Sequence, residues 1–303
     1  MVLARSSEIH EDVLSRPAAP LSAVLDGFSI EVMPRTAAKV ESFAELFPAK
    51  TRIYIAHIEG TPIDDMVATA TRIAREGFPV MPHIPARLLP DEATFRDWLT
   101  RYRDEAGVDQ ALVLAGGLSK PAGAYENSMQ LLESGVFDAL GYKRLHVAGH
   151  PEGNRDIDPD GSTRMVDEAV QWKQAFSERT DAEMALVTQF VFEAQPVIDW
   201  AEGLKQAGVS LPIHFGVAGP AKLQTMLKFA VSCGVGPSLR VLKRRAKDIT
   251  KLLKPHEPTA VLKDMADHME EFPDSLVSRV HVFPFGGIRT AAEYVARQVS
   301  GEE

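Results

Sequence analysis

Short apolar segments alternate with helical patterns along most of this chain, and this alternation constrains the fold more than any other feature. Parallel strands joined by helices produce such a pattern, because each strand is covered by the helix that follows it. Eight segments have the length and composition of buried strands: 28–33, 52–58, 79–84, 110–115, 144–149, 184–190, 212–217 and 277–283. Eight strand–helix units in one chain are typical of a (β/α)8 TIM barrel.

Helical patterns fall between the strands at 64–76, 91–106, 163–177 and 196–207, and a last one at 291–299 closes the chain. The segment 220–272 exceeds one barrel helix, so we expect two or three helices there. We predict a single barrel domain over residues 23–303, preceded by an N-terminal arm of residues 1–22. A doubly wound open sheet is the alternative, although it usually has fewer strands.

Composition excludes several classes of protein. With 303 residues, 45% hydrophobic and 25% charged, the chain has the composition of a soluble globular protein. Its formal net charge of -9 argues against general nucleic-acid binding. The single cysteine, Cys233, allows no internal disulfide and favours a reducing compartment. No signal-peptide pattern and no apolar run of membrane-span length is present. We predict a cytoplasmic protein without a membrane or nucleic-acid partner, and a homo-oligomer remains open.

Two polar residues interrupt strands that otherwise look buried. Glu31 lies within an apolar strand, where burial is expected to raise its pKa and suit it to general acid catalysis. A structural glutamate paired with arginine is the alternative. Gln189 ends the sixth strand, and its amide can donate and accept hydrogen bonds at the edge of a heterocycle. The alternative role for Gln189 is to cap the next helix.

Other strand ends carry weaker signals. His57, Glu59 and His83 can be read as metal ligands, but later strands offer no further ligands, so hydrogen-bonding histidines and no metal are predicted. Gly116 and Gly117 allow close approach of a ligand to the backbone, or form a common turn.

The loop after the fifth strand places His150 and Glu152 among small residues and a proline, which favours a binding role over a plain turn. The basic run Arg240–Lys247 is read as a solvated helix face or as a site for a polyanionic tail. No dinucleotide fingerprint, P-loop or nucleophile elbow is present.

The ordered set of strand ends resembles the methylenetetrahydrofolate reductase family. The motifs are Ser29–Pro34, Pro82-His83, Gly116-Gly117, Pro151–Gly153 and Thr188–Phe190. The resemblance spans about residues 28–290. It implies an FAD-containing (β/α)8 barrel that reduces 5,10-methylenetetrahydrofolate to 5-methyltetrahydrofolate, with NADH or NADPH reducing the flavin.

The resemblance also implies roles for individual residues. Glu31 matches the catalytic acid and Gln189 the residue that holds the pterin. Further substrate contacts are implied at Phe190, Leu223 and Phe283. Contacts with FAD are implied at His83, Leu114, Ala115, Gly116, Gly117, His150, Glu152, Asn154, Glu168, Gln171 and Lys173.

The chain departs from the family pattern in several places. Ala115-Gly116-Gly117 stands where the family has Arg-Gly-Asp, so a phosphate partner and a negative charge beside the flavin are missing. Leu223 stands where some members have a stacking aromatic residue. The tail-binding arginine of the family is absent near Gly286-Gly287, which leaves Arg240–Lys247 as candidates for the glutamate tail.

Three functional hypotheses follow. The first is a flavin-dependent methylenetetrahydrofolate reductase that acts in one-carbon metabolism and methionine biosynthesis. The second is a divergent folate-dependent one-carbon enzyme with another reductant. The third is a non-catalytic folate- or flavin-binding subunit.

Overall fold

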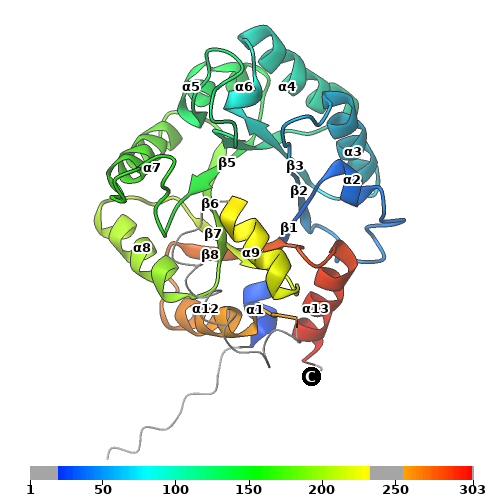
Figure 1. Ribbon diagram of the computed structural model, residues 1–303, viewed down its shortest axis with the longest axis vertical. Coiled ribbons are helices and arrows are strands. Elements are labelled where there is room, and N and C mark those ends of the chain that lie inside the picture. Colours follow the sequence, from blue (N-terminus) through cyan, green and yellow to red (C-terminus); the bar gives the residue numbers. More distant parts are fainter. Residues whose placement is uncertain (1–19, 233–254, 302–303) are drawn as a thin grey trace, which may run out of the picture.

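The computed structural model describes residues 20–232 and 255–301, and these form a closed barrel of eight parallel strands (Figure 1). Each strand pairs with the next one along the chain, and β8 closes the barrel against β1. The strands are β1 (Ser29–Val32), β2 (Arg52–Ile55), β3 (Val80–Pro85), β4 (Gln110–Leu114), β5 (Arg144–Gly149), β6 (Glu183–Val191), β7 (Ile213–Ala218) and β8 (Val277–Phe283). The predicted single-domain (β/α)8 fold is confirmed.

Helices surround the barrel and cover the outer faces of its strands (Figure 1). The longer ones are α3 (Ile63–Arg75), α4 (Glu92–Ala106), α7 (Arg164–Ser177), α8 (Gln195–Gln206), α9 (Leu223–Ser232), α12 (Thr259–Glu271) and α13 (Ile288–Ser300). Short helical segments are α1 (Leu21–Leu25), α2 (Pro34–Ala37), η1 (Ala86–Leu88), α5 (Ser128–Glu133) and α6 (Val136–Ala139).

Helix α4 illustrates how local sequence sets these elements. Asp91 caps its start by accepting a hydrogen bond from the Thr94 backbone N–H, and Gly107 ends it in a left-handed conformation. Phe95 and Leu99 lie four residues apart on one face, and both are fully buried. This burial against the barrel, rather than propensity alone, holds the helix in place.

The predicted segments match the observed elements, with small shifts at their ends. The predicted arm of residues 1–22 overlaps α1, because Leu21 already begins that helix. Helices α9 and α12 fall in the long segment between β7 and β8. Arg240–Lys247 lies outside the described residues.

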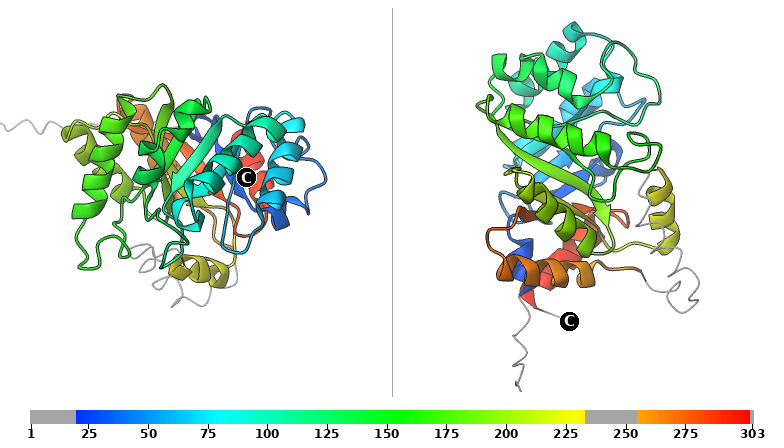
Figure 2. Two further views of the ribbon diagram at one scale, coloured as in Figure 1. Left: turned by 90° about the horizontal axis from the view of Figure 1, so that it is seen from above. Right: turned by 90° about the vertical axis from the view of Figure 1, so that its left-hand side faces the viewer.

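The two ends of the barrel differ in what covers them. The loop after β7 leads to α9, which lies across one end of the barrel (Figure 1). Figure 2 shows α9 standing off this end, which we call the mouth. The opposite end, the base, is formed by the first residues of the strands together with α1 and α13. No helix within the described ranges is long and apolar enough to cross a membrane.

The barrel interior is unusually polar. Tyr54, His146, His214 and His281 all lie within it and are almost completely buried. The Tyr54 hydroxyl lies 2.5 Å from His146 Nδ1, and the Tyr54 ring lies 4.5 Å from that of His281. Buried polar groups need such partners, so these contacts form a connected layer between mouth and base.

Candidate functional site

A cavity of about 820 Å³ opens at the mouth of the barrel. This end carries the active sites of TIM-barrel enzymes, because the strand–helix loops gather there. The structure brings together several predicted site residues, which line the cavity: Glu31, His83, Leu114, His150, Gln189, Phe190 and Phe283. The cavity therefore contains most residues predicted to bind the substrate and some of those predicted to bind the cofactor.

Glu31 lies between two histidines in this cavity. Its Oε2 lies 3.2 Å from His83 Nε2 and 3.8 Å from His281 Nε2. Burial pushes the pKa of the carboxyl upward, but the charge and hydrogen-bonding capacity of His83 and His281 outweigh it and lower the pKa to about 2. The expectation of a raised pKa is therefore wrong, because the pairing of Glu31 with His83 and His281 joins strands that are distant in the sequence. Glu31 is an ionised acceptor in the folded protein.

His281 is held in place from its other side. Its Nδ1 lies 2.8 Å from the Ser29 hydroxyl, and Ser29 and Glu31 sit two residues apart on the inner face of β1. Burial lowers the pKa of His281, although the neighbouring Glu31 opposes this shift. His281 was not predicted; its position in the alternating Val280–Phe283 segment of β8 was the available signal.

Gln189 owes its position to an irregularity in β6. Val187 pairs with His214 and Phe190 with Gly216, so β6 contains one more residue than β7 over this stretch. The Thr188 hydroxyl accepts a hydrogen bond from Gly216 N–H at 2.9 Å and donates one to the Gln189 carbonyl at 2.7 Å. Thr188 therefore satisfies the backbone where the regular ladder is broken.

Gly216 is required at this bulge. A Cβ there would lie 2.6 Å from the Gln189 carbonyl oxygen and 2.7 Å from the Phe283 ring. The side chain of Gln189 lines the cavity, and its Oε1 is buried without a hydrogen-bond partner among the described residues. A buried amide oxygen without a partner is costly, so a ligand donor is the natural partner for it.

An aromatic group covers one side of the cavity. Phe190 contacts Phe283 and Phe285 edge-on, with ring centroids 5.8 and 4.8 Å away. Phe229 stacks on Phe285 at 4.2 Å. Phe190, Phe229, Phe283 and Phe285 all line the cavity. Phe229 and Phe285 were missed because neither follows directly from a strand pattern.

Leu223 does not line the cavity as predicted. It is 4% exposed and packs in a small apolar cluster with Phe190, Ala218 and Met226. Phe229 reaches the cavity from the same helix, α9, so the aromatic surface is supplied one to two turns later in the chain.

The glycines after β4 lie outside the cavity lining, although Leu114 is part of it. The Ala115 carbonyl accepts a hydrogen bond from Arg87 N–H, and Gly116 has φ +93° and packs on Pro85. Gly117 is exposed. These positions form a turn against η1, which is the simpler of the two roles considered for them.

The loop after β5 is built mainly from its own contacts. His150 lines the cavity, and burial together with the charge of Lys173 lowers its pKa to about 4. Asn154 uses its side-chain oxygen to accept from Asp156 N–H within the loop. Glu152 is half-buried and lies outside the cavity lining.

The three positions predicted on α7 as FAD contacts lie outside the cavity lining. Glu168 is exposed and pairs with Arg164. Gln171 is also exposed, and its amide donates to the Ala207 carbonyl. Lys173 is buried and donates to the Ala148 carbonyl at 2.8 Å, and burial lowers its pKa to about 8. Its ammonium group is therefore hydrogen-bonded to the barrel wall.

Cations line the outer part of the cavity. Arg35, Lys39 and Arg289 are exposed there, and Glu31 is the one carboxylate among the described lining residues. Arg289 follows Gly286-Gly287 by two residues, so a guanidinium is present near the position where the sequence comparison found none. The alternating strand pattern could not reveal it, because Arg289 lies at the start of α13.

The other histidine considered as a metal ligand has a different environment. His57 Nε2 lies 3.0 Å from the Thr61 carbonyl, and its ring lies 4.7 Å from Trp98. Burial lowers the pKa of His57. Glu59 is exposed. His57 is thus a buried hydrogen-bonding histidine, and His83 instead pairs with Glu31.

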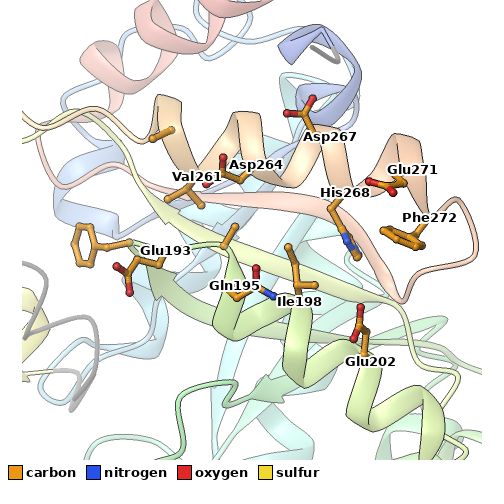
Figure 3. Close-up of a pocket in the computed structure, with 13 residues that line it drawn as sticks. Glu193, Gln195, Ile198, Glu202, Val261, Asp264, Asp267, His268, Glu271 and Phe272 are labelled. Carbon is orange, nitrogen blue, oxygen red and sulfur yellow. The ribbon is translucent and has the colours of Figure 1, made fainter. Parts of the chain in front are cut away.

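A second hollow of about 800 Å³ lies outside the barrel, between α8 and α12 (Figure 3). Acidic side chains dominate its lining, and Figure 3 shows Glu202 on one side and Asp264 and Glu271 on the other. None of the predicted site residues lies there. The mouth cavity is therefore the better candidate site.

Comparison with known proteins supports the fold. No family model matches the chain. An uncharacterised protein from Clostridium thermocellum that binds two copies of 5-methyl-5,6,7,8-tetrahydrofolic acid superposes with a TM-score of 0.58 at 12% identity, covering 90% of this chain and 94% of that one. A dihydropteroate synthase from Anaplasma phagocytophilum with bound 6-hydroxymethylpterin-monophosphate reaches a TM-score of only 0.45 at 14% identity, over 90% and 98% of the two chains. The chain is thus a (β/α)8 barrel whose architecture is shared with the clostridial protein.

Proposed function

We propose that this protein binds a reduced folate at the mouth of its barrel and acts on the one-carbon unit that the folate carries. The observation that carries the proposal is the Gln189 side chain, whose buried Oε1 lacks a hydrogen-bond partner among the described residues, in the cavity that the ionised Glu31 also lines. A pterin ring presents N–H donors and ring acceptors along one edge, which suits an amide and a carboxylate side by side.

The rest of the cavity suits the same ligand. Its volume of about 820 Å³ lies within the range of roughly 300–1,000 Å³ that small-molecule sites occupy. The partly buried rings of Phe229, Phe283 and Phe285 offer surfaces for stacking, and Phe190 packs behind them. Arg35 and Arg289 at the rim suit the carboxylates of a glutamate tail. The folate bound by the clostridial protein of the same fold adds support.

Calorimetric titration with 5-methyltetrahydrofolate tests this proposal. The wild-type protein should bind, and Gln189→Leu should weaken binding about 10- to 100-fold, because one hydrogen bond is lost and ligand donors stay unpaired. Gln195→Leu is the matched control, since Gln195 is exposed on α8, lies outside the mouth cavity and donates to Asp199. Equal affinity of wild type and Gln189→Leu would contradict the assignment.

Reduction of 5,10-methylenetetrahydrofolate is the more specific candidate activity. Glu31 and His83 both line the cavity and form a carboxylate–imidazole pair, and such a pair can take part in proton transfer to the folate. Because Glu31 itself is ionised, the imidazole is the better proton donor. The Glu31 carboxylate then stabilises the imidazole when it carries the proton.

The source of the hydride for this reaction needs its own measurement. FAD would supply hydride chemistry if bound, and the three α7 residues predicted to contact it bond protein groups in this structure. The visible spectrum of the purified protein, followed by turnover assays with NADH and with NADPH, separates the alternatives. Flavin bands that NADH or NADPH bleaches support the flavin-dependent reductase. Turnover without flavin supports another reductant, and folate binding without turnover supports a binding subunit.

A further inference from the structure

A third cavity, of about 930 Å³, lies at the base of the barrel, opposite the folate site proposed above. Three arginines line it. Arg52 and Arg144 are the first residues of β2 and β5, and Arg279 is the third residue of β8. The closed barrel brings these three strands to one opening, so the three guanidinium groups share it.

Positive charge exceeds negative charge in this cavity. Its described lining holds the three arginines and Lys50 against Asp26 and Glu183. Arg144 pairs with Glu183, whose side chain is 72% exposed. Arg52 and Arg279 meet neutral partners instead: Arg52 Nε donates to Gln110 Oε1 at 2.8 Å, and Arg279 Nη1 donates to the Gly27 carbonyl at 3.3 Å.

The arginines lie close enough to affect one another and the histidines behind them. Burial lowers the pKa of Arg52, and the charges of Arg144 and Arg279 lower it further. Burial and the charges of Arg52 and Arg279 also lower the pKa of His214 to about 3. Glu183 offsets part of this repulsion at Arg52, and positive charge still exceeds negative charge in the described lining of the cavity.

His214 adds a polar group without a partner. It lines the cavity, is only 5% exposed, and its Nδ1 has no hydrogen-bond partner among the described residues. As a neutral imidazole it can still offer one N–H donor. His146 lines the same cavity but is bonded to Tyr54.

We propose that the base of the barrel is a binding site for a small organic phosphate. Guanidinium groups bind phosphate through paired hydrogen bonds, and two of the three here have only neutral partners. The cavity also has apolar walls, including Phe28, Met184 and Val295, which suit an organic group next to the phosphate. The site is independent of the folate proposal, because it lies at the other end of the barrel.

The test uses the full chain and two probes, inorganic phosphate and phenyl phosphate, each compared with sodium chloride at equal ionic strength. Both probes should raise the melting temperature beyond the salt control, since a ligand that binds only the folded state stabilises it. Phenyl phosphate should bind more tightly than inorganic phosphate. Phenol, which lacks the anion, should not stabilise the protein.

Variants locate the binding. Arg279→Gln should weaken phenyl phosphate binding at least tenfold. Arg103→Gln should not, because Arg103 lies on α4, outside this cavity, and pairs with Asp104. If Arg279→Gln fails to fold, Arg144→Gln provides the same comparison. Stabilisation no greater than that by sodium chloride, or equal binding by the base variants and Arg103→Gln, would overturn the proposal.

Discussion

The mouth and the base of this barrel both hold buried histidines, but the charged groups that face these histidines differ between the two ends. At the mouth, His83 and His281 face an ionised Glu31. At the base, His146 and His214 lie behind three arginines whose carboxylate partners are few and exposed. The buried histidines therefore have charged neighbours of opposite sign at the two ends of the barrel.

The difference also sets what each end can bind. Among the described residues, the mouth offers one carboxylate, an amide oxygen without a hydrogen-bond partner and aromatic surfaces, which suits a neutral heterocycle with N–H donors. The base offers guanidinium groups and suits an oxyanion. Changes confined to one end should therefore leave the other end's ligand unaffected, and the predictions below use this independence.

The largest effect is expected at the bulge that aims Gln189 into the mouth. Gly216→Ala puts a Cβ against the Gln189 carbonyl and the Phe283 ring, so it should lower the free energy of unfolding by about 1–3 kcal/mol. Folate binding should fall more than tenfold, while phosphate binding at the base should persist. Chemical denaturation and calorimetry measure both.

Gly203→Ala is the matched control, because nothing lies within 4 Å of a Cβ at that position in α8. There, alanine should stabilise the helix by roughly 0.5–1 kcal/mol. Loss of folate binding by this control, or normal binding by Gly216→Ala, would break the link between the bulge and the site.

Acid should remove the contributions of His214 at the base and Glu31 at the mouth in different pH ranges. The His214 pKa of about 3 lies below its ordinary value of 6.5, so the unfolded state binds this proton first and stability falls as pH drops from 6.5 toward 3. The Glu31 pKa of about 2 lies below its ordinary 4.5, so its contribution is complete above pH 4.5 and is lost as pH falls toward 2.

Variants can separate these two contributions. Between pH 6.5 and 4.5, His214→Gln should reduce the slope of unfolding free energy against pH by up to about 1.4 kcal/mol per pH unit. Glu31→Gln should flatten the curve below pH 4.5, and it should not reduce the slope between pH 6.5 and 4.5, because losing the carboxylate lowers the pKa of His281 further. Denaturation series at half-unit pH steps measure the slopes. An unchanged curve below pH 4.5 in Glu31→Gln would argue against an ionised carboxylate at the mouth.

The smallest effect on ligand binding is expected at Lys173. Because its ammonium donates to the Ala148 carbonyl inside the barrel wall, Lys173→Met should cost about 1 kcal/mol of stability and change folate affinity less than threefold. If Lys173 instead binds FAD phosphate, the variant should lose flavin while keeping its stability. Flavin absorbance and thermal melting of the same sample distinguish these outcomes.

The fold was predictable because a buried parallel strand followed by a helix leaves a strong pattern. All eight strands and the long helices lie within a few residues of their predicted positions. The N-terminal segment was less predictable: Leu21 and Ser22 belong to α1, which is too short for a periodic signal.

The site was predictable only in part, because strand alternation shows where a side chain is placed but not what it meets. Glu31 and Gln189 were found from polar residues in apolar strands. The sign of the Glu31 pKa shift was missed, because His83 and His281 come from strands distant in sequence. Phe229 and Arg289 were missed because they project from the helices that follow β7 and β8.

A crystal structure with 5-methyltetrahydrofolate tests the central claim most directly, because it distinguishes the mouth from the base and from the acidic groove between α8 and α12. We predict the pterin ring in the mouth cavity, with a ring N–H within about 3.2 Å of Gln189 Oε1 and the Glu31 carboxylate beside it. Folate bound at the base or in the acidic groove, with the Gln189 amide oxygen still unpaired, would contradict this account.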